Sequence, residues 1–115
     1  MAIIERRATK LVEEALSDTP IAVILGARQV GKSTLAQGIL GNIVSRYVTL
    51  DDPVQRAAAS RDPVTFVDQF SRGCLGIDEV QRVPELVLAL KATVDRNRRP
   101  GRFLLTGSAN LLRLP

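Results

Sequence analysis

The chain has 115 residues, a formal net charge of +4 at pH 7, 45% hydrophobic residues and 3% aromatic residues. This length suits one domain, and its apolar fraction is normal for a globular protein. The lack of histidine excludes histidine acid–base catalysis and histidine metal ligands, and the single cysteine excludes an internal disulfide, as expected of a cytoplasmic protein.

Residues 1–17 have the apolar spacing of an amphipathic helix. The polar side of this helix carries charges of both signs, which favours packing on the domain itself over binding a membrane surface or a partner. No apolar stretch is long enough for a signal peptide or a membrane span, so we expect no membrane association. The apolar face consists of Ile4, Ala8, Leu11, Val12, Ala15 and Leu16.

The next segment, 26–33, matches the phosphate-binding pattern G-x-x-x-x-G-K-[ST] at every fixed position. The apolar run 21–25 before it predicts a strand, and residues 32–40 after it predict a helix capped by Gly41. In that setting, backbone N–H groups and the helix N-terminus attract phosphate. A glycine-containing turn with an exposed Lys-Ser pair is the less favoured alternative.

The pattern predicts an ATP site with Mg²⁺, which also suits the positive net charge. Lys32 can reach the β- and γ-phosphates, and the Ser33 hydroxyl can ligate Mg²⁺. The predicted nucleotide-binding residues are Gly26, Ala27, Arg28, Gln29, Val30, Gly31, Lys32, Ser33 and Thr34.

Residues 46–50 predict the second strand, and two Asp-Pro steps follow at 52–53 and 62–63. An Asp at the N-cap and a Pro at the first helical position predict that a helix begins at each step. The acidic pair at 51–52 could instead bind a metal, but capping explains both steps without one.

The mostly apolar run 74–78 predicts a buried parallel strand in which Cys74 is a structural thiol. Asp78 ends this strand, where open α/β sheets bind ligands, and would hold Mg²⁺ directly or through water. Glu79 would polarise the attacking water as general base. A strand that ends in a solvated acidic turn is the alternative, and it is less favoured about 45 residues after a phosphate loop.

A helix is predicted from Pro84 onward, followed by the basic run 96–102. This run could contact nucleic acid or lend an arginine to a neighbouring subunit. A solvated turn at a helix C-terminus is favoured, because no aromatic residues alternate with the arginines. The residues expected to face the sheet are Val83, Leu86, Val87, Leu90 and Val94.

Residues 102–106 predict a further buried strand that ends in a small polar turn. Thr106, Ser108 or Asn110 would lie near the γ-phosphate and hold the attacking water, and the pattern leaves open which of them does so. The alternative is a plain turn in which Ser108 or Asn110 caps a helix. Strands and helices then alternate along the whole chain, which predicts an α/β fold with a parallel sheet.

The strings ILGARQVGKSTL, GIDEVQRVPEL and RFLLTGSANLL resemble the core of prokaryotic AAA-superfamily ATPases of the AAA-14 type. The resemblance, from about residue 21 to residue 114, implies a three-layer P-loop NTPase fold with a mostly parallel sheet. The three strings would be Walker A, Walker B and the sensor-1 strand, with Glu79 as the catalytic carboxylate and Thr106 or Ser108 as the sensor. The sensor-1 strand would lie between the other two.

Members of this family continue with a fifth strand, an arginine finger and a C-terminal domain, so the resemblance describes a domain truncated after the sensor-1 strand. Arg113 is too close to that strand to be a convincing finger. An unpaired edge on the first strand predicts self-association. The expected protein partner is another copy of the chain, in a homo-oligomer, or the missing C-terminal domain. The predicted function is Mg-dependent ATP hydrolysis. The alternative is a nucleotide-gated interaction or nucleic-acid-binding module with negligible turnover.

Overall fold

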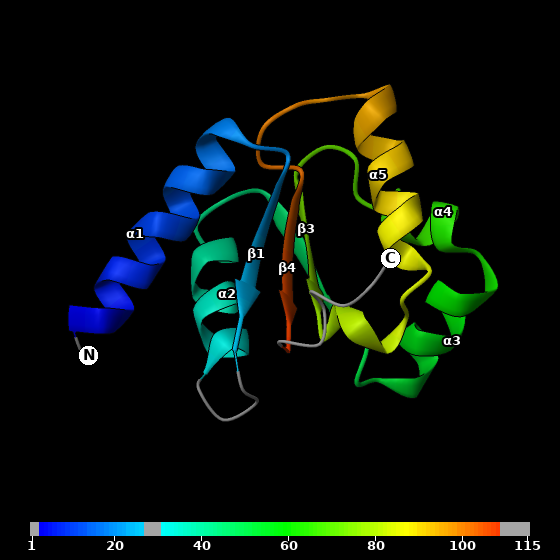
Figure 1. The fold of residues 1–115 in the computed structure, drawn as a ribbon, viewed down its shortest axis with the longest axis horizontal. Helices are drawn as coiled ribbons and strands as arrows, with labels where there is room; N and C mark the ends of the chain where they lie inside the picture. The colour runs from blue at the N-terminus through cyan, green and yellow to red at the C-terminus, as the bar shows by residue number, and fades with distance from the viewer. Residues whose placement is uncertain (1–2, 27–30, 109–115) are drawn as a thin grey trace.

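The computed structural model describes residues 3–26 and 31–108 (Figure 1). The elements in chain order are α1 (Ile3–Asp18), β1 (Ile21–Leu25), α2 (Lys32–Leu40), β2 (Ser45–Thr49), α3 (Pro53–Arg61), α4 (Pro63–Val67), β3 (Cys74–Asp78), the 3₁₀ helix η2 (Val80–Arg82), α5 (Leu86–Arg96) and β4 (Phe103–Gly107). This alternation confirms the α/β prediction. None of the helices in these two ranges is long and apolar enough to cross a membrane.

The described strands form one parallel sheet in the order β1-β4-β3-β2. The last strand therefore lies between β1 and β3, which confirms the predicted sheet order. In register, Leu25 pairs with Gly107 and Thr49 pairs with Asp78, so the carboxyl ends of all four strands meet along one edge. That edge is the place where ligands bind in open α/β sheets.

Helices cover both faces of this sheet, which makes three layers (Figure 1). Helices α1 and α2 lie on one face, and α3, α4 and α5 lie on the other. Strand β4 shows the alternation that builds both cores, because Phe103 and Leu105 pack with one group of helices and Leu104 packs with the other. Both faces of β3 and β4 are buried, as is usual in parallel sheets.

The helix starts predicted from the Asp-Pro steps are confirmed. Asp52 caps α3 by accepting a 2.9 Å hydrogen bond from the Val54 N–H, and Asp62 caps α4 by accepting one of 3.2 Å from the Thr65 N–H. Gly41 caps the C-terminus of α2 as predicted. The side-chain oxygens satisfy N–H groups that the first helical turn leaves free.

Several predicted boundaries shift by one or two residues. Strands β2 and β4 occupy 45–49 and 103–107 rather than 46–50 and 102–106. Helix α5 begins at Leu86, because the N–H groups of Leu86 and Val87 bond to carbonyls only three residues earlier and form a turn. Of the five residues expected to face the sheet, four are buried and Val87 is half-buried.

Part of the basic run after α5 is used inside the domain. The Arg99 guanidinium donates hydrogen bonds to the backbone carbonyls of Ser71 and Gly73. Arg102 is buried and lies 3.0 Å from an Asp68 carboxylate oxygen. These contacts tie the turn before β4 to the turn before β3. Arg96 also donates a 3.5 Å hydrogen bond to Thr93 Oγ1, so three of the four arginines of the run have structural partners.

Candidate functional site

The predicted site residues meet at the carboxyl edge of the sheet. Lys32 and Ser33 begin α2, Asp78 ends β3 with Glu79 directly after it, and Thr106 is the penultimate residue of β4. Ser33 is half-buried and the other four are at most 5% exposed. Charged groups are rarely buried without partners, so the pairing of these side chains determines what the site can do.

Lys32 and Glu79 form a buried ion pair. The Lys32 ammonium lies 3.0 Å from Glu79 Oε2, and the two side chains are 2% and 6% exposed. The predicted phosphate ligand and the predicted general base therefore hold one another. A pair this deep is less screened by water than one at the surface.

The Asp78 carboxylate accepts hydrogen bonds from three hydroxyls on three other elements. Ser33 Oγ lies 2.7 Å from Oδ1, Thr49 Oγ1 lies 2.9 Å from Oδ2, and Thr106 Oγ1 also donates to Oδ1. Burial alone would raise the pKa of Asp78, but the hydrogen bonds outweigh it and the pKa lies below the ordinary value for aspartate. Asp78 is consequently a carboxylate at neutral pH.

Glu79 has a left-handed backbone, with φ 57° and ψ 49°. Among the residues placed in the structure it is the one non-glycine with a positive φ, and such residues often mark functional sites. Its N–H donates to Thr106 Oγ1 at 3.1 Å, and its Oε1 accepts from Gln81 Nε2 at 2.7 Å. Partners on both its backbone and its side chain stabilise this conformation.

Two glycines frame the predicted phosphate loop. Gly31 has φ 74°, a conformation that suits glycine, and directly precedes α2. The Gly26 N–H donates to the Gly107 carbonyl at 3.2 Å, which joins the end of β1 to the end of β4. Thr34 is exposed in the first turn of α2. The remaining predicted loop residues, 27–30, lie outside the described part of the chain.

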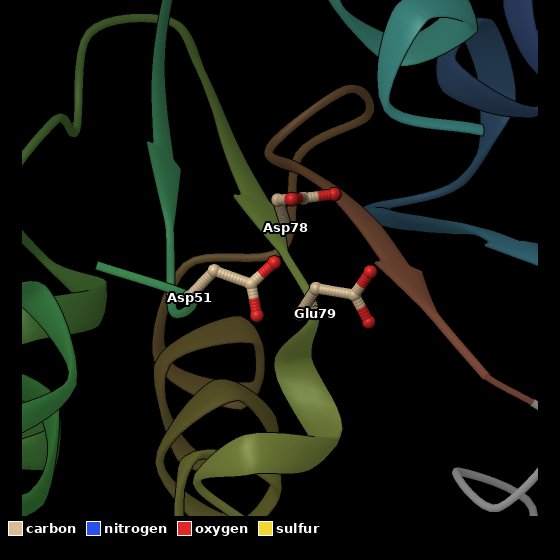
Figure 2. Close-up of side chains that lie close together, drawn as sticks. All are labelled: Asp51, Asp78 and Glu79. Atoms are coloured by element: carbon tan, nitrogen blue, oxygen red, sulfur yellow. The ribbon is translucent and has the colours of Figure 1, made fainter. Parts of the chain in front are cut away.

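A third carboxylate, Asp51, joins Asp78 and Glu79 (Figure 2). One oxygen of each of the three residues lies within 4.8 Å of the others, so the group could hold a metal ion. Asp51 also pairs with Arg82, whose Nε lies 2.6 Å from its Oδ1. The prediction that capping explains the 51–52 pair is confirmed for Asp52, but the Asp51 carboxylate belongs to this acidic group.

Of the three candidates for the polar residue at the end of β4, the structure describes two. Thr106 contacts both Asp78 and Glu79. Ser108 is half-buried, and its backbone N–H donates to Gln81 Oε1 at 3.3 Å. Asn110 and Arg113 lie outside the described residues.

Three further residues at the site, Thr49, Gln81 and Tyr47, were not predicted from the sequence. Burial raises the pKa of Tyr47 despite opposing hydrogen-bond contributions from Gln37 and Ser33, and the residue also interacts with Asp78. Thr49 and Tyr47 become neighbours of Asp78 through the pairing of β2 with β3. The one available signal was position, since Thr49 ends a strand and Gln81 follows the acidic pair by two residues.

Comparison with known proteins agrees with this arrangement. The family model AAA-14, described as an AAA domain, matches residues 18–115. The chain belongs to the AAA-14 family. The AAA-14 match covers the sheet, α2 and all the described site residues, and it identifies the chain as an AAA-type nucleotide-binding domain.

The AAA-14 domain is also similar to longer bacterial proteins. It is 37% identical over 109 residues to the uncharacterized protein Mb2031c of Mycobacterium bovis and to the uncharacterized protein Rv2008c of Mycobacterium tuberculosis. Each alignment covers 94% of this chain and 24% of the relative. The chain therefore spans about a quarter of the length of these relatives.

Proposed function

We propose that the AAA-14 domain binds ATP with Mg²⁺ and hydrolyses it to ADP and phosphate. One observation carries this proposal: four predicted site residues meet at one edge of the sheet. Lys32 is hydrogen-bonded to Glu79, and Ser33 is hydrogen-bonded to Asp78. These are the residue types that P-loop ATPases use to bind phosphate, hold the metal and orient water.

Residues 26–34 and the N-terminus of α2 would bind the phosphates. Gly31 has a left-handed conformation and directly precedes a helix of 9 residues. The N–H groups of a first helical turn have no carbonyl partner within the helix, so they can bind an anion. Lys32 would reach the β- and γ-phosphates from the first turn of that helix. Lys32 would thereby exchange the Glu79 carboxylate for a phosphate as its partner.

The donors beside this helix suit Mg²⁺, which prefers oxygen ligands. Ser33 and Asp78 would hold the ion, directly or through water, and the hydrogen bonds that lower the pKa of Asp78 keep it a carboxylate. Asp51 lies close enough to Asp78 to add a second carboxylate oxygen. When bound, Mg²⁺ would neutralise charge on the β- and γ-phosphate oxygens.

Glu79 would act as general base once Lys32 turns to the phosphates. A freed carboxylate can accept a hydrogen bond from water and, later, its proton. Thr106 would support this step as the sensor residue, because it already bonds to both Asp78 and the Glu79 backbone. Ser108 is the second sensor candidate, since it contacts Glu79 indirectly through Gln81.

The second candidate function is a nucleotide-gated module with negligible turnover. If the Lys32–Glu79 pair persisted with nucleotide bound, Glu79 would stay bonded to Lys32 and could not act as the base, and such a site would be a module of this kind. Nucleic-acid binding has less support, since Arg99 and Arg102 bind groups within the domain. A homo-oligomer or a further domain of a longer protein would supply any arginine finger.

Calorimetric titration with Mg·ATP tests the binding proposal, and phosphate release tests hydrolysis. Lys32→Ala should abolish saturable binding, and circular dichroism should first establish that this variant is folded. Glu79→Gln should bind Mg·ATP and lose nearly all phosphate release, keeping only a small residual rate. A folded wild-type chain that binds no Mg·ATP would contradict the proposal, and binding without turnover in the wild type would favour the module.

A further inference from the structure

The Gln81 side chain uses both ends of its amide group. Its Nε2 donates to Glu79 Oε1 at 2.7 Å, and its Oε1 accepts from the Ser108 backbone N–H at 3.3 Å. A carboxylate can only accept a hydrogen bond and a backbone N–H can only donate one, so these two partners fix the orientation of the amide. Gln81 thus links the carboxylate after β3 to the backbone after β4.

The local backbone makes this contact possible. Glu79 is left-handed, and the 3₁₀ helix η2 begins directly after it. This turn brings the side chain of residue 81 back to the carboxylate two residues earlier. A left-handed backbone is costly for a residue with a Cβ, so its occurrence here points to a conformation that its surroundings hold in place.

The two oxygens of Glu79 have different partners. Oε2 pairs with the Lys32 ammonium, which in the proposed function leaves to bind phosphate. Oε1 bonds to Gln81, which belongs to the same turn as Glu79. This hydrogen bond would need no rearrangement when nucleotide enters. The direction of the carboxylate in the loaded site would therefore depend on Gln81.

We propose that Gln81 is a positioning residue that orients the Glu79 carboxylate toward the attacking water and couples it to the segment after β4 through Ser108. This inference rests on the proposed ATP hydrolysis. Gln81 touches neither phosphate nor water in this role, and it acts through Glu79. A carboxylate held by one hydrogen bond less would spend less time in the geometry that the reaction needs.

Kinetics can separate this role from support of the turn alone. Gln81→Met keeps a similar side-chain length and removes the hydrogen bonds. We expect its single-turnover rate with Mg·ATP to fall about tenfold to a hundredfold, the range typical of residues that orient a reacting group. Its dissociation constant for Mg·ATP should stay within about twofold of wild type, since the phosphate ligands are unchanged.

The matched control is Gln55→Met. It makes the same replacement on α3, where Gln55 lines a separate hollow with Arg61, Thr65 and Gln69. Its single-turnover rate should equal that of the wild type. An unchanged rate in Gln81→Met, or equal losses in the two variants, would overturn the positioning role.

A double-mutant cycle tests whether Gln81 acts through Glu79. In a Glu79→Gln background, Gln81→Met should lower the residual single-turnover rate no further, because the group it orients is already disabled. The same fold-loss in both backgrounds would contradict the proposal.

Amide NMR tests the physical link without any turnover. The Ser108 N–H resonance should shift in Gln81→Met and in Glu79→Gln, and stay in place in Gln55→Met. An unchanged Ser108 N–H resonance in both Gln81→Met and Glu79→Gln would overturn the link. A wild-type chain without hydrolysis would overturn the proposed function and the positioning role of Gln81 together, whereas hydrolysis at full rate in Gln81→Met would overturn only the positioning role.

Discussion

The Lys32 ammonium lies 3.0 Å from Glu79 Oε2, and the two side chains are only 2% and 6% exposed to water. In the proposed cycle both residues need other partners, phosphate for Lys32 and water for Glu79. ATP must therefore compete with Glu79 for Lys32. Entry of the nucleotide and release of the base would then be one event.

This competition predicts that Glu79→Gln binds Mg·ATP more tightly than the wild type. The neutral amide holds Lys32 more weakly and repels the γ-phosphate less, so we expect a dissociation constant about threefold to tenfold lower. Calorimetric titration at fixed ionic strength measures it. Glu85→Gln is the matched control, because Glu85 is an exposed residue at the start of α5. Weaker binding by Glu79→Gln would show that the pair does not oppose the nucleotide.

The Thr106 hydroxyl is expected to stabilise the fold as well as the site. It donates to Asp78 and accepts from the Glu79 N–H, and the residue is 1% exposed. Thr106→Val keeps the shape, leaves the buried Glu79 N–H unpaired and removes one of the three hydroxyls that bond to Asp78, so the free energy of unfolding should fall by about 1–3 kcal/mol. Urea denaturation measures the loss. Thr106→Ser keeps the hydroxyl and should lose less, and equal losses would argue against a hydrogen-bond origin.

Cys74 should react slowly in the folded chain. Burial raises the pKa of its thiol to about 11, although the nearby Arg99 acts to lower it. The thiolate is the reactive form, so alkylation by iodoacetamide at pH 8 should be far slower than in urea. Comparable rates in the two conditions would mean that Cys74 is accessible or ionised in the fold.

The same pKa predicts how stability depends on pH. A pKa raised by folding stabilises the folded state below the unfolded value, and this contribution is lost as the pH rises through the folded value. The free energy of unfolding should therefore fall between about pH 9 and about 11, and Cys74→Ala should lack this part of the decline. If the free energy of unfolding declined equally with pH in the wild type and in Cys74→Ala, the raised pKa of Cys74 would be contradicted.

Strand β1 gives a prediction about association. Within the described residues it pairs with β4 and forms one edge of the sheet, and its residues Val23 and Leu25 are 44% and 39% exposed. Exposed apolar edges promote strand pairing between molecules. We expect sedimentation velocity to show association that grows with concentration and that Leu25→Lys weakens. A single monomeric species at high concentration would refute this expectation.

The local sequence predicted most of the helices and strands, and it predicted the phosphate-loop and acidic residues of the site. The spacing of Gly26, Gly31, Lys32 and Ser33 predicted the turn into α2, and the Asp-Pro steps predicted where α3 and α4 begin. An apolar run that ends in Asp78 predicted β3. These signals are readable because turns, caps and buried strands depend on residues a few positions apart.

The tertiary structure alone decided which side chains meet. Thr49 reaches Asp78 because β2 pairs with β3, and Thr106 reaches both acidic residues because β4 inserts between β1 and β3. The left-handed backbone of Glu79 turns Gln81 back onto its carboxylate. Such contacts depend on strand register and one unusual dihedral angle as well as on strand order. The family resemblance predicted the strand order, but the local sequence encodes neither the register nor the dihedral angle, because both result from packing the whole sheet.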